Sequence, residues 1–433
     1  MLSAFANALR TPDLRKKILF TLMILAVFRL GSVIPTPNVN IVNVDQCRTL
    51  ATSGDSAGLY SMIQLFSGGA LLQLAIFALG IMPYITASII LQLLTVVIPR
   101  LEALKKEGAA GTAKITQYTR YLTLVLAVLN STAFVTLAVN GGLFQGCSLD
   151  LVYDKGIFAI VVMVLTMTAG TGLIMWMGEL ITERGIGNGM SVMIFTQIAA
   201  QFPASLWAIK ESREGAQGWL LFILVLAVGL AVMAGVIFME QAQRRIPVQY
   251  AKRVVGRRMY GGQSTHIPLS VNQAGVIPVI FASSVLAFPL TLAQFIPALE
   301  GLSRVVGYGT VVYNILYALL TMFFTYFYTA VTFDPREVAD NMKKWGGFVP
   351  GLRPGRPTAQ YLDRILTRIT LVGAVFLAVM AVLPYIMAGI TRMPPGMLYF
   401  GGTSVLIAVG VALDTVKQIE AHLLMRHYEG FLK

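Results

Sequence analysis

The sequence predicts an all-α polytopic membrane protein, with ten transmembrane helices in two inverted five-helix halves. Composition gives the class, because 56% of the 433 residues are hydrophobic and only 12% are charged. An ordinary soluble domain carries about 25% charged residues. Apolar runs of about 20 residues, the length that crosses a bilayer as a helix, recur along the whole chain. Between Asp55 and Arg100 no residue carries a full charge.

Ten apolar runs are long enough to span a membrane. They cover residues 18–34, 71–98, 121–139, 157–177, 190–208, 219–239, 274–296, 311–331, 369–390 and 398–413. Pro35 and Pro37 follow the first run where a cleavage site would need small residues, so we expect no cleaved signal peptide. The fifth run is the least apolar, since it starts at a glycine cluster, residues 185–189, and contains Thr196 and Gln197.

Lysine and arginine set the orientation, because short loops rich in these residues stay in the cytoplasm. With the N-terminus inside, the inner loops and termini hold 26 of the 33 basic residues, and the outer loops hold six. Arg29 lies within the first run. The sequence therefore predicts that both termini are cytoplasmic.

Ten spans with both ends inside divide into five and five, and the second half then enters the membrane from the opposite side. Inverted halves of this kind build a central pathway between them. The N-terminal half is expected at residues 1–208 and the C-terminal half at 209–433. Two cytoplasmic loops, near 241–272 and 332–368, belong to the C-terminal half.

The sequence lacks the motifs of nucleotide binding and of zinc binding. A phosphate-binding G-x-x-x-x-G-K-[ST] motif is absent, and residues 185–189 lack the third glycine of G-x-G-x-x-G, so that cluster is interpreted as a flexible inner loop. No Cys/His spacing suggests zinc, and no cofactor is expected. Cys47 and Cys147 both fall in outer loops, where an oxidising compartment permits a disulfide; two unpaired thiols remain open.

The acidic residues weigh against ion-coupled transport. None lies in the middle of a span, and the nearest, Glu179, Glu240 and Asp414, fall at predicted ends. A secondary transporter normally needs an intramembrane carboxylate. Composition and topology therefore favour a pore, with an assembly scaffold that has no open pore as the other reading.

Five stretches carry a resemblance to a known family. They read AIFALGIMPYITASIILQLLTVVIP, GELITERGIGNGMSVMIF, YAKRVVGRRMYGGQSTHIPLSVNQAGVIPVIFASS, FDPREVADNMKKWGGFVPGLRPGRPTAQYLDRIL and YFGGTSVLIAVGVALDTVKQIEAHLL. Their order and spacing resemble the SecY family, the channel subunit of the bacterial Sec protein translocase. The resemblance runs from about Leu14 to the end of the chain and implies a protein-conducting channel in the plasma membrane, not an enzyme.

The resemblance implies an hourglass pore with a ring of aliphatic side chains at its waist, which seals by dewetting. The matching positions are Ile81, Ile85, Met190, Ile194, Ile280 and Ile407. Met190 replaces the isoleucine expected there, and its thioether keeps the position apolar but more flexible. On spacing alone, Ile81 and Ile85 could equally face lipid or a neighbouring helix.

A plug helix and a lateral gate are implied in the same way. The plug maps to residues 57–69, with an interfacial helix as the alternative; its residues are Tyr60, Ser61, Met62, Ile63, Gln64, Leu65 and Phe66. The glycine pair Gly68 and Gly69 would serve as its hinge. The gate admits signal sequences, and its polar residues map to Thr86, Ser88, Asn130 and Asn272. Asn130 replaces an expected glutamine, and ordinary helix-packing contacts are the other reading.

The basic inner loops become a docking surface for the SecA motor and the ribosome. Its residues are Arg244, Arg245, Tyr250, Lys252, Arg253, Arg257, Arg258, Arg353 and Arg356. Contacts to ribosomal RNA phosphates would be salt-dependent. On charge alone, such loops set topology and contact anionic lipids. Further partners implied are the small membrane subunits SecE and SecG, and the substrates are unfolded polypeptides.

Overall fold

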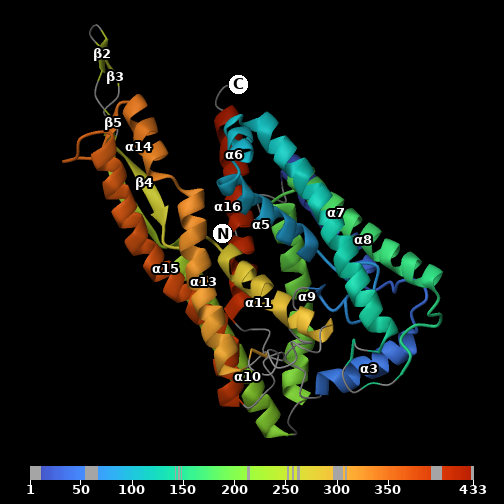
Figure 1. Ribbon diagram of the computed structural model, residues 1–433. Coiled ribbons are helices and arrows are strands. Elements are labelled where there is room, and N and C mark those ends of the chain that lie inside the picture. Colours follow the sequence, from blue (N-terminus) through green and yellow to red (C-terminus); the bar gives the residue numbers. More distant parts are fainter. Residues whose placement is uncertain are drawn as a thin grey trace. The chain divides into compact units, whose positions relative to one another are not determined.

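The computed structural model of the chain (Figure 1) describes residues 11–53, 67–141, 143–144, 147, 149–211, 215–250, 253–255, 258–260, 264–295, 306–307, 310–391 and 402–430. Its residues form two compact units. Unit 1 comprises Met1–Ala227, Met387–Phe400 and Ile407–Lys433, and unit 2 comprises Val228–Ile386 and Gly401–Leu406.

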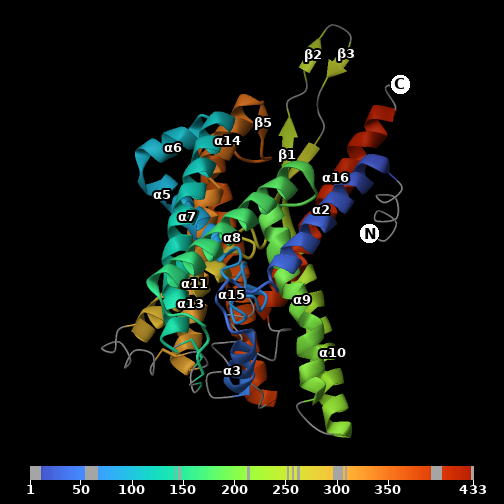
Figure 2. The ribbon, with the colours of Figure 1, turned by 90° about the vertical axis from the view of Figure 1, so that its right-hand side faces the viewer.

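Unit 1 is built from helices. They are α2 (Pro12–Gly31), α3 (Ile41–Ser53), α5 (Met82–Val97), α6 (Pro99–Lys106), α7 (Ala109–Val139), α8 (Ile157–Arg184) and α9 (Gly189–Glu211), together with parts of α10 (Ala216–Gln241) and α16 (Gly402–Gly430). The long helices α7 and α8 lie side by side (Figures 1 and 2). Leu14 of α2 and Ile419 of α16 share one buried cluster with Ile186.

The second predicted span differs from the expectation. Residues 68–81 form turns, with Ala75 bridged to Pro35, and the helix starts only at Met82. Gly80 has φ +56° and Leu74 has φ +48°, values that break a helix. The turn segment is nevertheless apolar because it is buried: Leu74 is fully buried, and its carbonyl accepts hydrogen bonds from the amide and the hydroxyl of Thr36.

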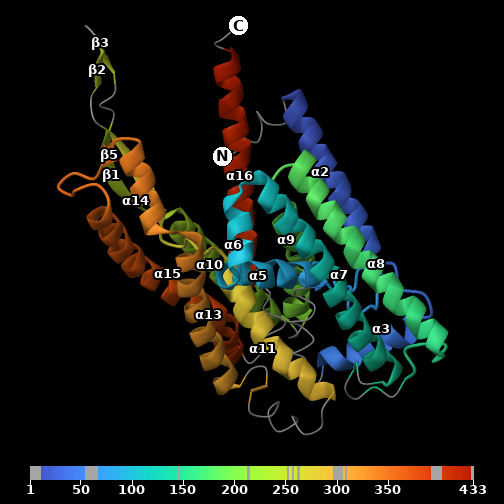
Figure 3. The same ribbon diagram turned by 45° about the horizontal axis from the view of Figure 1, so that its top comes forward.

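The same span also ends in a sharp bend. Pro99 cannot donate the backbone hydrogen bond that would continue α5, and the preceding Ile98 is extended, with ψ 112°. Helix α6 leaves at 100° to α5, as Figure 3 shows. The chain thus runs from a buried turn segment into the apolar helix α5 and then into the short helix α6, which points in a different direction.

Unit 2 combines helices with a small sheet. Its helices are α11 (Ile277–Phe295), α13 (Val311–Thr332), α14 (Pro335–Lys344) and α15 (Arg356–Thr391) up to Ile386, together with parts of α10 and α16. Strands β1 (Gln243–Tyr250), β4 (Ser264–Ser270) and β5 (Gly347–Phe348) form an antiparallel sheet in the order β4-β1-β5. Strands β2 (Arg253–Val255) and β3 (Arg258–Tyr260) pair as a hairpin that projects beyond this sheet (Figures 1 and 2).

Each of the ten predicted spans coincides with a helix, although not all of these helices are long and apolar enough to cross a membrane. Among the described residues six helices meet that test, or seven if the bent pair α5–α6 is one span. Helix α2 fails because it carries Arg15, Lys16, Lys17 and Arg29. The count of ten spans therefore stays a prediction.

Candidate functional site

Two of the predicted pore residues lie on one face of α9. Met190 and Ile194 are four residues apart, which places them on the same side of a helix; Ile194 is 8% exposed and Met190 is half-buried. Gly178 of α8 lies against this face, since a Cβ atom there would be 2.5 Å from Sδ of Met190. A Cβ atom on Gly189 would overlap the carbonyl oxygen of Gly178. The two glycines therefore allow α8 and α9 to approach, and Met190 fills the space beside them.

The glycine cluster that precedes α9 is held in place by hydrogen bonds, whereas the sequence predicts a flexible loop. The amide of Ile186 donates to Oγ1 of Thr21 on α2 at 3.2 Å, and the amide of Gly187 donates to Oε1 of Gln418 on α16 at 3.0 Å. The amide of Gly189 donates to Oγ1 of Thr182 at 2.9 Å. Gly187 has φ +88°, which favours glycine. This loop fixes the start of α9 and thereby the position of Met190.

Ile81 and Ile85 stand at the first turn of α5. Ile81 caps the helix and is 1% exposed, and the amide of Ile85 donates to its carbonyl at 3.1 Å. Pro83 in the first turn costs no hydrogen bond there, because the first amides of a helix have no intrahelical partner. The helix thus begins at the first predicted pore residue.

The other two predicted pore residues are buried aliphatic side chains in different units. Ile407 of α16 belongs to unit 1 and is 2% exposed, and Ile280 of α11 belongs to unit 2 and is 6% exposed. Unit 1 therefore supplies five of the six positions. That the six side chains form one ring stays a prediction.

A polar cluster that sequence reasoning missed surrounds the predicted hinge. A Cβ atom on Gly68 would lie 3.2 Å from Cγ of Gln197 and 3.4 Å from Nη1 of Arg29. At Gly69 it would lie 3.0 Å from Nε2 of Gln201. Both glycines have positive φ, 62° and 87°, so glycine is required by conformation and by close approach. Residues 54–66, which include every predicted plug residue from Tyr60 to Phe66, lie outside the described residues.

Within the part of the chain that the structure describes, this cluster has unpaired hydrogen-bonding atoms. Nη1 of Arg29 and both amide atoms of Gln197 are buried without a hydrogen-bond partner. Gln197 is 1% exposed and follows Met190 and Ile194 on the same face of α9. The spacing of 190, 194, 197 and 201 along one face is the signal that could have identified Gln197 and Gln201 from sequence.

The predicted gate residues of unit 1 lie on packed helices. Thr86 and Ser88 are half-buried on α5, and Asn130 is exposed on α7, which packs against α5. Oγ1 of Thr86 donates to the carbonyl of Met82 within its own helix at 3.0 Å. Their role at a gate stays a prediction.

Asn272 of unit 2 has an acidic partner that the sequence did not reveal. Its Nδ2 donates to Oε1 of Glu240 at 2.6 Å and to the carbonyl of Gly275 at 3.1 Å. Asn272 is 6% exposed, and a polar side chain buried to this extent is costly unless it is hydrogen-bonded. The bond ties the end of α10 to the turn that starts α11.

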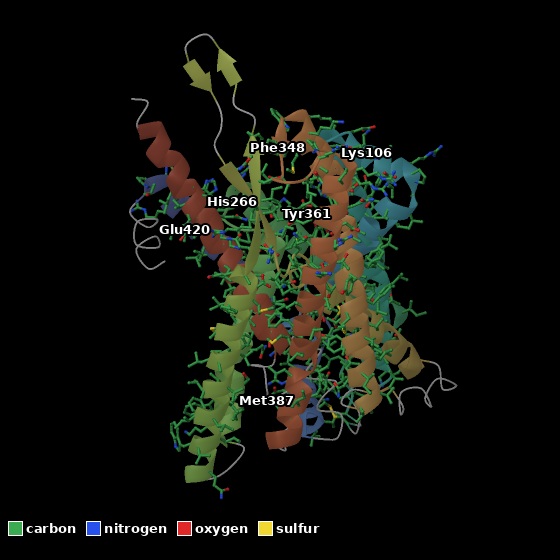
Figure 4. All side chains as sticks on the ribbon, turned by 90° about the vertical axis from the view of Figure 1, so that its left-hand side faces the viewer. Lys106, His266, Phe348, Tyr361, Met387 and Glu420 are labelled. Carbon is green, nitrogen blue, oxygen red and sulfur yellow. A yellow bond between two sulfur atoms is a disulfide. The ribbon has the colours of Figure 1, made fainter. Side chains whose placement is uncertain are left out.

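The two basic loops that the sequence predicts to be cytoplasmic meet in a single sheet. Strand β1 pairs with β4 in the first loop and with β5 in the second, with Gln249 opposite Phe348 and Tyr250 opposite Gly347. Ile246 and Val248 point from β1 into a cluster with Leu362 of α15. Figure 4 labels His266 on β4 and Phe348 on β5, which lie opposite Pro247 and Gln249 of β1, and Tyr361 on α15.

The predicted docking residues whose side chains the structure describes are all exposed. Arg244 and Arg245 are exposed on β1, Tyr250 is 37% exposed at its end, and Arg353 and Arg356 are exposed before and at the start of α15. The hydroxyl of Thr358 donates to the carbonyl of Arg353 at 2.9 Å and fixes that loop. Arg253 and Arg258 lie in the β2–β3 hairpin, but their side chains, like Lys252 and Arg257, are outside the described residues.

Ion pairs reinforce the helices near α5 and α6. Nε of Arg120 on α7 lies 2.8 Å from Oε1 of Glu179 on α8. On α6, the ammonium of Lys106 lies 2.7 Å from Oε1 of Glu102, and its hydrogen bond holds the pKa of that exposed carboxyl below its usual value.

Among the described residues no group of three or more His, Cys, Asp or Glu side chains could hold a metal ion.

Known proteins resemble this chain in sequence and in fold. The model of the family described as SecY matches residues 75–416. The protein translocase subunits SecY of Mycobacterium tuberculosis and Streptomyces coelicolor are each 58% identical to the chain, and both alignments cover 100% of both chains.

Solved structures show the same fold at low identity. "The structure of a protein conducting channel" superposes with a TM-score of 0.63, at 18% identity, over 94% of this chain and 91% of that one. Sec61 in the canine ribosome-channel complex from the endoplasmic reticulum superposes with a TM-score of 0.59, at 18% identity, over the same shares.

Proposed function

The chain belongs to the SecY family, and from this premise we propose that it is the channel subunit of a protein translocase, a transporter and not an enzyme. It passes unfolded secretory polypeptides across the bacterial plasma membrane and releases membrane segments sideways into the lipid. The observation that carries the proposal is the full-length match, at 58% identity, to proteins named protein translocase subunit SecY.

The seal of the proposed channel is an aliphatic ring formed by Ile81, Ile85, Met190, Ile194, Ile280 and Ile407. Water confined among such side chains gains no hydrogen bonds, so the constriction dewets and holds back ions. The burial of Ile81, Ile194, Ile280 and Ile407 fits this role. Residues 57–69 form the plug that reinforces the seal, with its hinge at Gly68 and Gly69.

Signal sequences open the proposed channel at a lateral gate that contains Thr86, Ser88, Asn130 and Asn272. A gate must separate, so its contacts should be few and weak; single hydrogen bonds between membrane helices average about 0.6 kcal/mol. The bond from Asn272 to Glu240 is different, because it lies within unit 2. It fixes the turn that starts α11 while that helix moves during opening of the proposed gate.

The exposed arginines of the β1 layer and of the loop before α15 dock the SecA motor and the ribosome. Sheet pairing between β1 and β5 supports this role, because it joins the two loops that carry Arg244, Arg245 and Arg353. SecE and SecG are the small membrane partners, and anionic lipids contact the basic loops. Both termini are cytoplasmic.

Site-specific photocrosslinking tests the channel function. A photoreactive residue would be placed at Ile81, at Ile280 or at Leu129, whose side chain on α7 is 61% exposed, and a secretory chain would be stalled during translocation. We expect adducts with the stalled chain at Ile81 and Ile280 and none at Leu129. Adducts at Leu129 alone would contradict a pore and favour a scaffold.

A further inference from the structure

A disulfide joins two segments of unit 1 that are far apart in sequence. Cys47 of α3 and Cys147 of the loop between α7 and α8 are bonded, with Cα atoms 5.5 Å apart and a sequence separation of 100 positions. Cys47 is 1% exposed, and Cys147 is partly exposed. Both pack in a cluster with Val44, Phe144 and Leu151.

Backbone and amide hydrogen bonds continue the same seam. The amide of Asn40 donates to the carbonyl of Leu151 at 2.9 Å, and Nδ2 of Asn43 donates to the carbonyl of Asp150 at 2.7 Å. Asn38 and Asp154 exchange two bonds, because Nδ2 of Asn38 donates to the carbonyl of Asp154 at 2.7 Å and Oδ1 accepts from its amide at 2.9 Å. These bonds hold residues 38–43, and the disulfide extends the attachment to the second turn of α3.

The position of the pair in the chain bears on membrane orientation. Disulfides form and persist in oxidising compartments and are rare where thiols are kept reduced. The bent pair α5–α6, taken as one span, and helix α7 lie between the two cysteines in sequence. Two crossings return the chain to the same side of the membrane, so both thiols can reach an oxidising side only after α5–α6 and α7 have been inserted.

We propose that Cys47 and Cys147 are an oxidative modification site on the outer face of the membrane, closed after insertion of α7 by an external disulfide-bearing oxidant. This covalent bond clamps α3 to the α7–α8 loop and marks the end of unit 1 that faces away from the cytoplasm. The inference rests on the proposed membrane location and does not depend on channel activity.

The difference in exposure sets the order of the chemical steps. The thiolate of Cys147, the more accessible residue, attacks the disulfide of the oxidant and forms a mixed disulfide while one sulfur of the oxidant leaves as a thiolate. The thiolate of buried Cys47 then attacks Sγ of Cys147 and releases the second sulfur. The two cysteines lose two electrons and two protons, and the oxidant is reduced to a dithiol.

Maleimide labelling of the full chain in cells tests the site. Denatured without reductant, the native chain should take up no maleimide-polyethylene glycol, and after reduction it should take up two. In folded C47S, a membrane-impermeant maleimide added outside should label Cys147 rapidly. In the matched variant C147S, buried Cys47 should label at least several-fold more slowly until the protein is unfolded.

Three results would overturn the proposal. They are two labels on the native chain without reductant, labelling of Cys147 in C47S only from the cytoplasmic side, and equal labelling rates in the two variants. The crosslinks at Ile81 and Ile280 are measured separately. Failure of this site would therefore leave the channel proposal standing, and failure of the channel proposal would leave the labelling result interpretable.

Discussion

Gly178 offers a direct test of how α8 positions the predicted pore residue Met190. In Gly178→Ala the new methyl group would lie 2.5 Å from Sδ and 2.9 Å from Cε of Met190, whereas carbon contacts are optimal at about 3.5–4.0 Å. The thioether must therefore move by about 1 Å. Because it is the end of a flexible side chain, we expect a modest loss of stability, about 1–3 kcal/mol, as for other overpacked sites.

Displacement of Met190 should have a larger effect on ion conductance through the proposed seal than on the stability of the fold. In proteoliposomes that contain the complete complex, Gly178→Ala should raise resting ion conductance several-fold and lower the melting temperature by a few degrees. Gly235→Ala is the matched control, because a Cβ atom there would meet nothing within 4 Å. It should change neither measurement by more than the small gain in helix propensity.

A double-mutant cycle isolates the cause. Met190→Ala removes the atoms that the new methyl group would strike, so the stability cost of Gly178→Ala should largely disappear in the double variant. Gly189→Ala provides the opposite case, since its Cβ would meet the carbonyl of Gly178, a backbone atom that cannot rotate away; it should destabilise more than Gly178→Ala. Additive effects of the first pair would refute the proposed contact.

Three further predictions follow from the other sites. Asn272→Leu removes the 2.6 Å hydrogen bond to the carboxyl group of Glu240, which should lower the free energy of unfolding by about 1–3 kcal/mol. It should also lower the hydrophobicity that a signal sequence needs for export. If the required hydrophobicity stays the same across a graded series of signal sequences, Asn272 has no role at the gate. Arg353→Glu should slow SecA-driven translocation several-fold in membrane vesicles, whereas Arg336→Glu, also exposed, should not; equal rates for both would remove Arg353 from the docking surface. The variant with Cys47→Ser and Cys147→Ser together should melt at a lower temperature. The unfolded chain regains the freedom of a loop of about 100 residues, which stabilises it by up to about 4–5 kcal/mol. The same melting temperature as the native chain would show that the hydrogen bonds of the seam hold α3 without the disulfide.

The sequence predicted the helical class and a helix at each expected span, because long apolar runs can satisfy their backbone only as helices. It misplaced the start of the second span, since hydropathy does not distinguish residues buried in turns, such as Leu74, from residues that face lipid. The pairing of β1 with β5 was also missed. It joins residues about 100 positions apart, and local periodicity carries no signal for such contacts.

The site divides in the same way. That Met190 and Ile194 share one face of a helix follows from their spacing, whereas their role at a pore comes from the family resemblance and stays a prediction. Contacts between elements could not be predicted: the bond from Asn272 to Glu240 and the approach of Arg29 to Gly68 depend on tertiary packing. The pairing of Cys47 with Cys147 was left open because spacing contains no distance between the two thiols.

If Met190 and Ile194 lie in the proposed seal, the face of α9 accounts for a constriction that is tight to ions and yet accepts any polypeptide. At a rise of about 1.5 Å per residue, Met190 and Ile194 define an apolar layer only about 6 Å deep, and Gln197 and Gln201 continue the same face with amides. An extended chain advances about 3.4 Å per residue, so the layer contacts only about two residues of a passing polypeptide at once. A single charged residue in transit therefore loses water over a short distance, while polar groups of the chain regain partners within one helical turn. A deeper apolar layer would hold back ions equally well but would select against polar substrates, so in the proposed channel the change from isoleucine to glutamine within one turn of α9 would favour passage without sequence preference.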